Sequence, residues 1–247
     1  MKVKAFFLFY RSIQNRNNYY DTIEVDMKLL FEAIIKYLFG VILVGILLFL
    51  PAGSFSWNHG LLFMALLFIP MFIAGIVMYL KAPNLLRSRL NAKEKQSKQK
   101  DVINYSGIMF ILAFIIAGLN YRFQWLSFPN IFVVIGSIIF LISYLLFAEV
   151  LRENAYLSRT IEVQENQKVV DTGLYAIVRH PMYFATLFLF LSMPFILNSP
   201  ISFLIMLSYI PIIVKRMKNE EEVLEKELDG YIEYKKKVKY RLLPFIY

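Results

Sequence analysis

Cysteine is absent from the 247-residue sequence, and histidine occurs only twice, as His59 and His180. The lack of cysteine excludes disulfide bonds, thiolate metal ligands and cysteine nucleophiles. Two histidines in different parts of the chain also argue against a multi-histidine metal site, so we expect no bound metal. Charged residues are scarce at 18%, compared with about 25% in soluble domains, and apolar residues reach 58%, compared with about 45–50%. This composition excludes an ordinary soluble domain.

Long apolar segments are abundant instead, and six stand out: residues 37–50, 61–80, 108–119, 131–148, 183–197 and 201–214. A helix needs about 20 apolar residues to cross roughly 30 Å of hydrocarbon. The second and fourth segments meet this length, the first does so if it extends back to Leu29, and the third if it begins near Val102. The last two are shorter, and the turn residues 198–200 between them predict a helical hairpin bent at Pro194 and Pro211. We therefore expect an all-α integral membrane fold with about six hydrophobic helices.

Lysine and arginine are distributed unevenly among the connections between these segments. Seven lie in residues 81–101, four in residues 151–180 and nine in the tail from Lys215, whereas the connections 51–58 and 198–200 have none. The positive-inside rule then places both termini, the two basic connections and the tail in the cytosol. The net charge of +9 is consequently expected to face anionic lipid, and we expect no nucleic-acid partner.

The segments divide the chain into three regions: an N-terminal extension of residues 1–28, four transmembrane helices within residues 29–150, and a C-terminal region of residues 151–247. Met27 stands just before the first apolar segment, so we expect the native protein to start there. The apolar patch at residues 5–10 is too short to be the core of a signal peptide.

The tail of the C-terminal region has the pattern of an amphipathic helix. Apolar residues recur there with helical spacing and predict one apolar face: Leu224, Leu228, Tyr231 and Ile232. The opposite side is predicted to be charged, with Glu221, Glu222, Glu225 and Lys236. We expect this helix to lie in the cytosol, either as a cover over a bound cofactor or simply along the membrane surface.

Polar residues gather in two stretches of the C-terminal region, residues 152–181 and the tail from Arg216, which only the hairpin separates. A hairpin returns the chain to the same membrane face, so both stretches should meet there. The first stretch contains Gly173-Leu174-Tyr175 and Arg179-His180-Pro181, with Tyr183 two positions further on. The second contains Arg216, Glu220-Glu221, Leu224, Tyr231, Tyr234 and Arg241…Pro244. As a set, these motifs resemble the isoprenylcysteine carboxyl methyltransferase family and the related phospholipid N-methyltransferases. The resemblance covers roughly residues 150–247, which makes this region the expected methyltransferase core.

This resemblance implies S-adenosylmethionine as the cofactor, bound by the stretch before G-x-Y, by the tyrosine of that motif and by H-P-x-Y. The matching positions are Gln164, Gln167, Lys168, Val169, Val170, Tyr175, His180, Pro181, Met182 and Tyr183. The His180–Pro181 junction also predicts the start of a helix, because proline suits the first helical turn, whose free N–H groups can bind a carboxylate. A Rossmann-type nucleotide site is excluded, since no G-x-G-x-x-G motif is present.

The substrate-side pair of the family, an arginine and a glutamate four residues later, falls on Arg216 and Glu220. In this interpretation Arg216 orients an acceptor carboxylate and Glu220 orients Arg216. The same residues would otherwise form a plain helical ion pair worth about 0.3–0.5 kcal/mol. Arg179 is left outside the predicted site, because an arginine at a membrane edge commonly acts as an anchor.

The apolar segments and this resemblance together imply an integral membrane methyltransferase that uses S-adenosylmethionine on a lipophilic or lipid-attached acceptor, with a carboxylate of the isoprenylcysteine type as the preferred acceptor. Two enzymatic alternatives stay open. One is a phospholipid or amine N-methyltransferase, in which Glu220 takes the proton of the acceptor. The other is an NADPH-dependent enzyme resembling membrane sterol reductases. A transporter or scaffold would need charged residues inside its membrane helices, and the sequence offers only Glu32 and Lys36, one turn apart near a helix end.

Overall fold

The computed structural model describes the backbone of residues 2–90, 97–154, 156–157 and 163–247, and side chains from Met27 onward except those of residues 97–99. Part of the basic connection at residues 81–101 lies outside these ranges. The described residues form helices joined by turns and coil, and they contain no strand. Residues 1–40 and 41–247 form two compact units.

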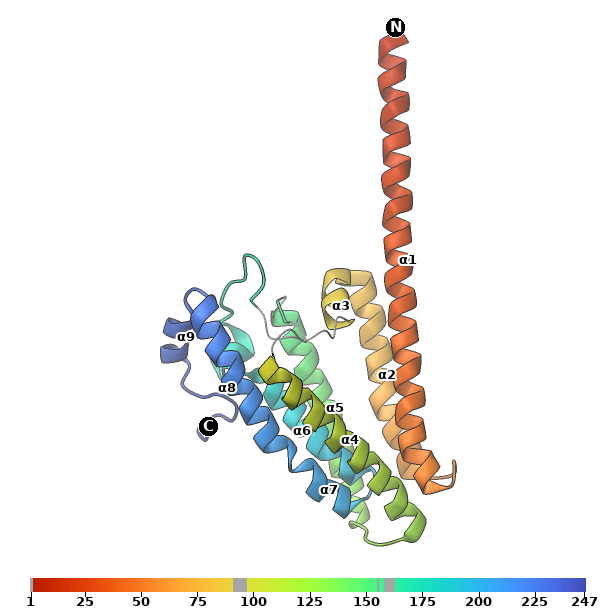
Figure 1. Ribbon diagram of the computed structural model, residues 1–247, viewed down its shortest axis with the longest axis vertical. Coiled ribbons are helices and arrows are strands. Elements are labelled where there is room, and N and C mark those ends of the chain that lie inside the picture. Colours follow the sequence, from red (N-terminus) through yellow and green to blue (C-terminus); the bar gives the residue numbers. More distant parts are fainter. Residues whose placement is uncertain (1, 91–96, 155, 158–162) are drawn as a thin grey trace. The chain divides into compact units, whose positions relative to one another are not determined.

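The first unit is part of helix α1, which spans Lys2–Ala52 (Figure 1). Within this helix, Met27–Ala52 is long and apolar enough to cross a membrane. Glu32 and Lys36 form an ion pair one helical turn apart, so the two charges partly neutralise each other near the end of the apolar segment.

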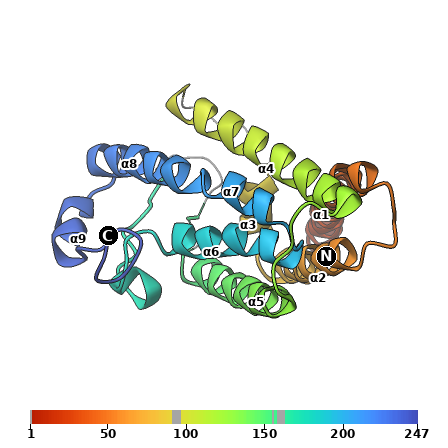
Figure 2. The same cartoon turned by 90° about the horizontal axis from the view of Figure 1, so that it is seen from below.

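The second unit contains the rest of the chain. Its helices follow in the order α2 (Asn58–Lys81), α3 (Pro83–Leu90), α4 (Ser97–Phe123), α5 (Asn130–Glu153), the 3-10 helix η1 (Gly173–Ala176), α6 (Pro181–Ile196), α7 (Pro200–Met206), α8 (Tyr209–Glu227) and α9 (Tyr231–Lys237). In two views α6 lies beside α5, and α4 lies beside α7 and α8 (Figures 1 and 2).

Five of the described helical segments are long and apolar enough to span a membrane: Met27–Ala52, Asn58–Lys81, Lys100–Phe123, Asn130–Glu153 and Pro200–Glu227. A sixth, α6, is apolar but shorter. Large apolar side chains on these helices are widely exposed, for example Leu145 at 71% and Leu204 at 67%, as expected for surfaces that face lipid. The predicted all-α, multi-pass membrane fold is confirmed.

The last two apolar segments form the predicted hairpin. Ser199 caps the returning arm by accepting the N–H of Ser202. That arm is divided, because α7 ends at Met206 and α8 begins at Tyr209. The division has a local cause, since Pro211 lacks the N–H that would donate to the carbonyl of Leu207 four residues earlier.

Close packing of α5 against α6 positions the first arm of the hairpin. A side chain at Gly136 would bring its Cβ within 2.7 Å of Phe195 and 3.2 Å of the Ser192 carbonyl oxygen. Glycine therefore lets the two helices approach at this point. Elsewhere the core of the second unit is aromatic, with Phe63, Phe140 and Trp57 almost fully buried.

The tail departs from the single amphipathic helix predicted from the sequence. Helix α8 continues from the hairpin into the tail and ends at Glu227, and Gly230 takes a left-handed conformation with φ of 83° before α9 begins. Tyr231 is buried, as predicted, whereas Ile232 is 49% exposed. The break shifts the helical phase, which is why the i+8 position leaves the apolar face.

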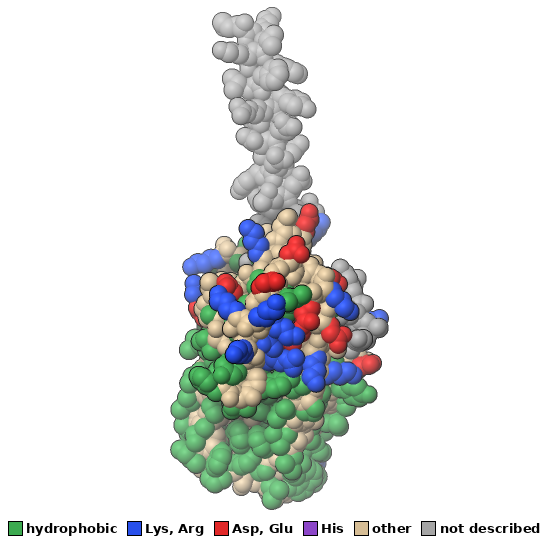
Figure 3. Space-filling view, turned by 90° about the vertical axis from the view of Figure 1, so that its left-hand side faces the viewer, with side chains coloured by type: hydrophobic (Ala, Val, Ile, Leu, Met, Phe, Trp, Pro, Cys, Tyr) green, Lys and Arg blue, Asp and Glu red, His purple; other side chains and the backbone are tan. Residues whose placement is uncertain are grey.

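Charged side chains gather at one end of the second unit, and hydrophobic side chains cover the opposite end (Figure 3). The charged end contains the end of α8 and all of α9, which carry Glu225, Lys226, Lys235 and Lys236. This distribution matches a molecule inserted in a bilayer with one end in water.

Candidate functional site

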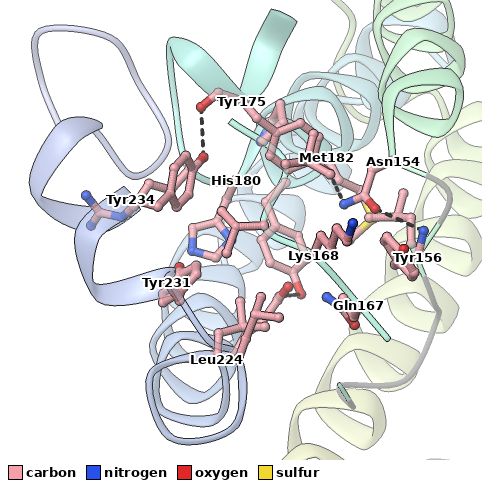
Figure 4. Close-up of a pocket in the computed structure, with 18 of the residues that line it drawn as sticks. Asn154, Tyr156, Gln167, Lys168, Tyr175, His180, Met182, Leu224, Tyr231 and Tyr234 are labelled. Carbon is pink, nitrogen blue, oxygen red and sulfur yellow. Dashed lines mark hydrogen bonds between the residues drawn. The ribbon is translucent and has the colours of Figure 1, made fainter. Parts of the chain in front are cut away.

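A cavity opens at the charged end, between the N-terminus of α6, the tail helices and the segment that precedes η1 (Figure 4). Its lining comprises Asn154, Tyr156, Leu157, Gln167, Lys168, Val169, Val170, Tyr175, Arg179, His180, Pro181, Met182, Tyr183, Arg216, Glu220, Leu224, Leu228, Tyr231 and Tyr234. The structure thus brings both predicted catalytic residues and nine of the ten predicted cofactor residues to one cavity. The remaining residue, Gln164, is not part of this lining and donates from Nε2 to the carbonyl of Tyr156, a lining residue, at 2.8 Å.

Helix α6 begins inside this cavity. Pro181 occupies its first turn, and His180 precedes it with non-helical dihedral angles (φ −123°, ψ 62°). The carbonyl of His180 accepts the N–H of Phe184 at 3.1 Å. The N–H groups of Met182 and Tyr183 belong to the first turn and have no carbonyl within the helix to bind. They form the kind of helix N-terminus that binds anionic groups.

Glu221 has a buried carboxylate that lies next to His180. Glu221 is 3% exposed, and its Oε1 accepts a hydrogen bond from Nε of Arg179 at 2.8 Å and lies 3.3 Å from Nε2 of His180. Its Oε2 accepts Nε of Arg241 at 3.0 Å. We call these four residues the Glu221 cluster. The prediction that Glu221 lies on the solvent side of the tail helix is wrong, because cations from two distant segments compensate its burial.

Two members of the Glu221 cluster, Arg179 and His180, also form hydrogen bonds that join the end of the chain to the start of α6. The side chain of Arg179 donates from Nη1 to the carbonyls of Val238 and Lys239, at 2.7 and 2.8 Å. The backbone N–H groups of Arg179 and His180 donate to the carbonyls of Tyr240 and Arg241, both at 2.9 Å. Arg179 is 7% exposed, so it is a buried structural cation rather than the membrane-edge anchor expected from the sequence.

Two predicted site residues on α8 meet a tyrosine from α6. The hydroxyl of Tyr183 donates to Oε2 of Glu220 and accepts a hydrogen bond from Nε of Arg216 at 3.0 Å. Both α8 residues line the cavity. Arg216 and Glu220 are therefore connected through Tyr183, and this arrangement is more specific than a simple helical ion pair.

Tyrosines form much of the remaining lining. The hydroxyl of Tyr175 accepts Nδ2 of Asn154 at 3.0 Å, and the hydroxyl of Tyr234 donates to the carbonyl of Tyr175 at 2.8 Å (Figure 4). Tyr231 has a buried hydroxyl with no hydrogen-bond partner among the described residues. Burial raises the pKa of Tyr175, Tyr231 and Tyr234 above the ordinary tyrosine value of about 10. All three hydroxyls are therefore protonated at neutral pH.

Gly173 fixes the approach of η1 to the end of α5. It has a φ of +53°, and a Cβ at this position would lie 1.7 Å from Oε1 of Glu153. The Glu153 carboxylate accepts the N–H of Leu174, with Oε2 at 2.9 Å. This contact holds the turn that presents Tyr175 to the cavity.

We expect Gly173→Ala to lower the thermal unfolding midpoint in detergent, because it adds a strained backbone conformation of about 1–3 kcal/mol and displaces Glu153. Gly107→Ala is the matched control, since its new Cβ meets nothing within 4 Å and α4 is helical there. The control should unfold at the wild-type midpoint or above it. Equal midpoints for the two variants would show that the close approach at Gly173 is unimportant.

Comparison with known protein families gives a match over the part of the chain that contains α6 and most of α8. A sequence model of the isoprenylcysteine carboxyl methyltransferase (ICMT) family matches residues 134–226. This segment, less than half of the chain, is similar to the ICMT family. The ICMT-family segment contains α6, α7 and nearly all of α8, and with them His180, Tyr183, Arg216 and Glu220. The match supports a membrane methyltransferase. No curated protein matches the chain.

Several residues of the cavity were missed as site residues by the sequence analysis: Asn154, Tyr156, Leu157, Arg179, Leu224, Leu228, Tyr231 and Tyr234. The last two lie on α9, beyond the ICMT-family segment. Their three-residue spacing was visible in the tail and places both on one helical face. Asn154 ends α5 as its C-cap and reaches Tyr175 over 21 positions of the sequence, which no local pattern could reveal.

Proposed function

We propose that the protein transfers a methyl group from S-adenosylmethionine to a lipophilic acceptor, with a carboxylate of the isoprenylcysteine type as that acceptor. One observation carries the proposal: within the ICMT-family segment, the helix N-terminus at His180–Tyr183 and the Arg216–Glu220 pair line the same cavity. The first group suits a cofactor and the second suits an acceptor, so the two reactants would lie side by side.

The lining has the donors that this cofactor requires. The first-turn N–H groups of α6 and the exposed cation of Lys168 suit the carboxylate of its amino-acid end. Aromatic faces of Tyr175, His180 and Tyr231 suit its ring and its cationic sulfonium. When bound, the cofactor supplies an activated methyl group on a positively charged sulfur. The chain itself supplies binding, orientation and exclusion of water.

An acceptor carboxylate needs no general base, because it is already ionised. The task of the protein is then to hold it in line with the methyl group in a site with little water. Arg216 is suited to bind this carboxylate, since the planar guanidinium offers parallel donors. The hydroxyl of Tyr183 accepts a hydrogen bond from Arg216 and is itself oriented by Glu220, so the two residues together fix the position of the arginine.

The charged end of the second unit is proposed to face the cytosol. It contains the cavity and the basic tail, with nine lysines and arginines from Lys215 onward, which the positive-inside rule places on the cytosolic side. A cytosolic cofactor would enter there, and an acceptor anchored in the bilayer would reach the same cavity from the membrane.

The test uses membranes that contain the protein, methyl-labelled S-adenosylmethionine and either a prenylated cysteine or a phospholipid acceptor. We expect labelled product from the prenylated cysteine that releases labelled methanol in base, which identifies a carboxyl ester. Base-stable label in the lipid fraction would instead identify N-methylation and replace the proposed acceptor. No label in either fraction would contradict methyl transfer itself.

His180→Ala should weaken binding of S-adenosylhomocysteine, the demethylated form of the cofactor, about tenfold or more, because it removes a ring that lines the cavity and alters the start of α6. Isothermal titration calorimetry in detergent measures this change. His59→Ala replaces the other histidine, which lies at the start of α2 and outside the cavity lining, and should keep wild-type affinity. Unchanged affinity in the His180 variant would leave this residue with a structural role alone.

A further inference from the structure

Tyr183 differs from the other tyrosines of the cavity in what its hydroxyl binds. Its hydroxyl donates to the Glu220 carboxylate and accepts from Nε of Arg216. Both partners lie on another helix, α8, on successive turns. The side chain of Tyr183 is 4% exposed, so water competes little for these bonds.

A tyrosine hydroxyl has one proton to donate, and in Tyr183 that proton is committed to Glu220. Tyr175 provides the contrast, since its hydroxyl accepts from Asn154 and keeps its own proton available for a ligand. The hydroxyl of Tyr183 is therefore poorly suited to bind the cofactor. The ring of Tyr183 lies 5.5 Å from the ring of His180, centroid to centroid, and still forms part of the cavity wall.

We infer that Tyr183 is a positioning residue of the acceptor side: its hydroxyl fixes Arg216 and Glu220 for binding of the acceptor and does not bind the cofactor. The inference rests on the proposed methyl transfer and changes the role that the family resemblance gave to this residue. The hydroxyl holds the guanidinium at Nε and turns the carboxylate of Glu220 toward α6. Without it, both long side chains regain alternative rotamers.

The test compares two tyrosines that make the same kind of contact between α8 and α6. Tyr209 donates from its hydroxyl to Oγ1 of Thr186 at 3.3 Å, lies outside the cavity lining and is 5% exposed. Tyr183→Phe should lower kcat about five- to tenfold, the scale of one lost hydrogen bond, and change the affinity for S-adenosylhomocysteine less than about twofold. Tyr209→Phe should leave both quantities at wild-type values.

A double variant separates positioning from an independent role. Because Tyr183 acts through Arg216, adding Tyr183→Phe to Arg216→Lys should cost little further kcat, whereas independent effects would multiply. The inference is overturned by unchanged kcat in Tyr183→Phe, by a loss of cofactor affinity that accounts for the lost activity, or by multiplying effects in the double variant. A Tyr183→Phe protein that fails to fold while Tyr209→Phe folds would also overturn it. Wild-type protein that neither binds the cofactor nor transfers methyl groups would instead contradict the proposed function.

Discussion

Arg216→Lys should lower turnover in methyl transfer about 10- to 100-fold, the scale expected when a positioning group is misplaced. Lysine keeps the positive charge, but it has neither the planar pair of donors nor the Nε that binds the Tyr183 hydroxyl at 3.0 Å. Affinity for S-adenosylhomocysteine should change less than about twofold, because the substitution acts on the acceptor side. Initial rates with labelled cofactor, together with calorimetry, measure the two effects separately.

Two further variants show whether the effect is specific. Arg87→Lys makes the same change at an exposed position of α3 that is outside the cavity lining, and it should keep wild-type turnover. The exchanged pair Arg216→Glu with Glu220→Arg restores opposite charges but not the arrangement around Tyr183, so we expect it to be inactive. Turnover near the wild-type level in the exchanged pair would reduce Arg216 and Glu220 to an ordinary ion pair.

Glu221→Gln should destabilise the protein by about 3–5 kcal/mol, the usual cost of breaking a buried ion pair from one side. Glutamine is nearly the same size, but it leaves the Arg179 guanidinium, 5% exposed, without its compensating charge. The tail is attached through the same cluster, so it should open first. Thermal unfolding in detergent and limited proteolysis of the tail measure the two consequences.

Glu225→Gln is the matched control for this prediction. Glu225 lies one turn further along α8, and its carboxylate, 36% exposed, pairs with Lys235. An exposed pair of this kind contributes about 0–1 kcal/mol, so the control should unfold near the wild-type midpoint and resist protease as well as the wild type. If Glu221→Gln behaved like Glu225→Gln, the Glu221 cluster would not be what holds the tail.

The apolar membrane helices were predictable because they depend on local composition. Apolar segments such as 61–80 and 131–148 are long enough to define helices without knowledge of their neighbours. The start of α6 was also predictable, because the preference of proline for the first helical turn is a property of the residue itself, and Pro181 occupies that turn. The break before α9 had a local signal as well, the Asp229-Gly230 pair typical of turns, but the regular spacing of Leu224 and Leu228 obscured it.

The electrostatic part of the site could not be predicted in the same way. Glu221 looks like a solvent-facing residue in the pattern of its own helix, and its burial depends on Arg179, 42 positions earlier, and on Arg241, 20 positions later. Likewise, nothing near Tyr183 in the sequence indicates a bond to Glu220. Motifs predicted which residues gather at the cavity, whereas their partners follow from the packing of α6, α8 and the tail.

The measurement that tests the central claim most directly is a calorimetric titration of the purified protein with S-adenosylhomocysteine, with NADPH titrated in parallel. The lining of the cavity, with a helix N-terminus and tyrosine faces beside Arg216 and Glu220, predicts saturable binding of one S-adenosylhomocysteine per chain and no binding of NADPH. Saturable binding of NADPH without binding of S-adenosylhomocysteine would contradict the account and favour a reductase.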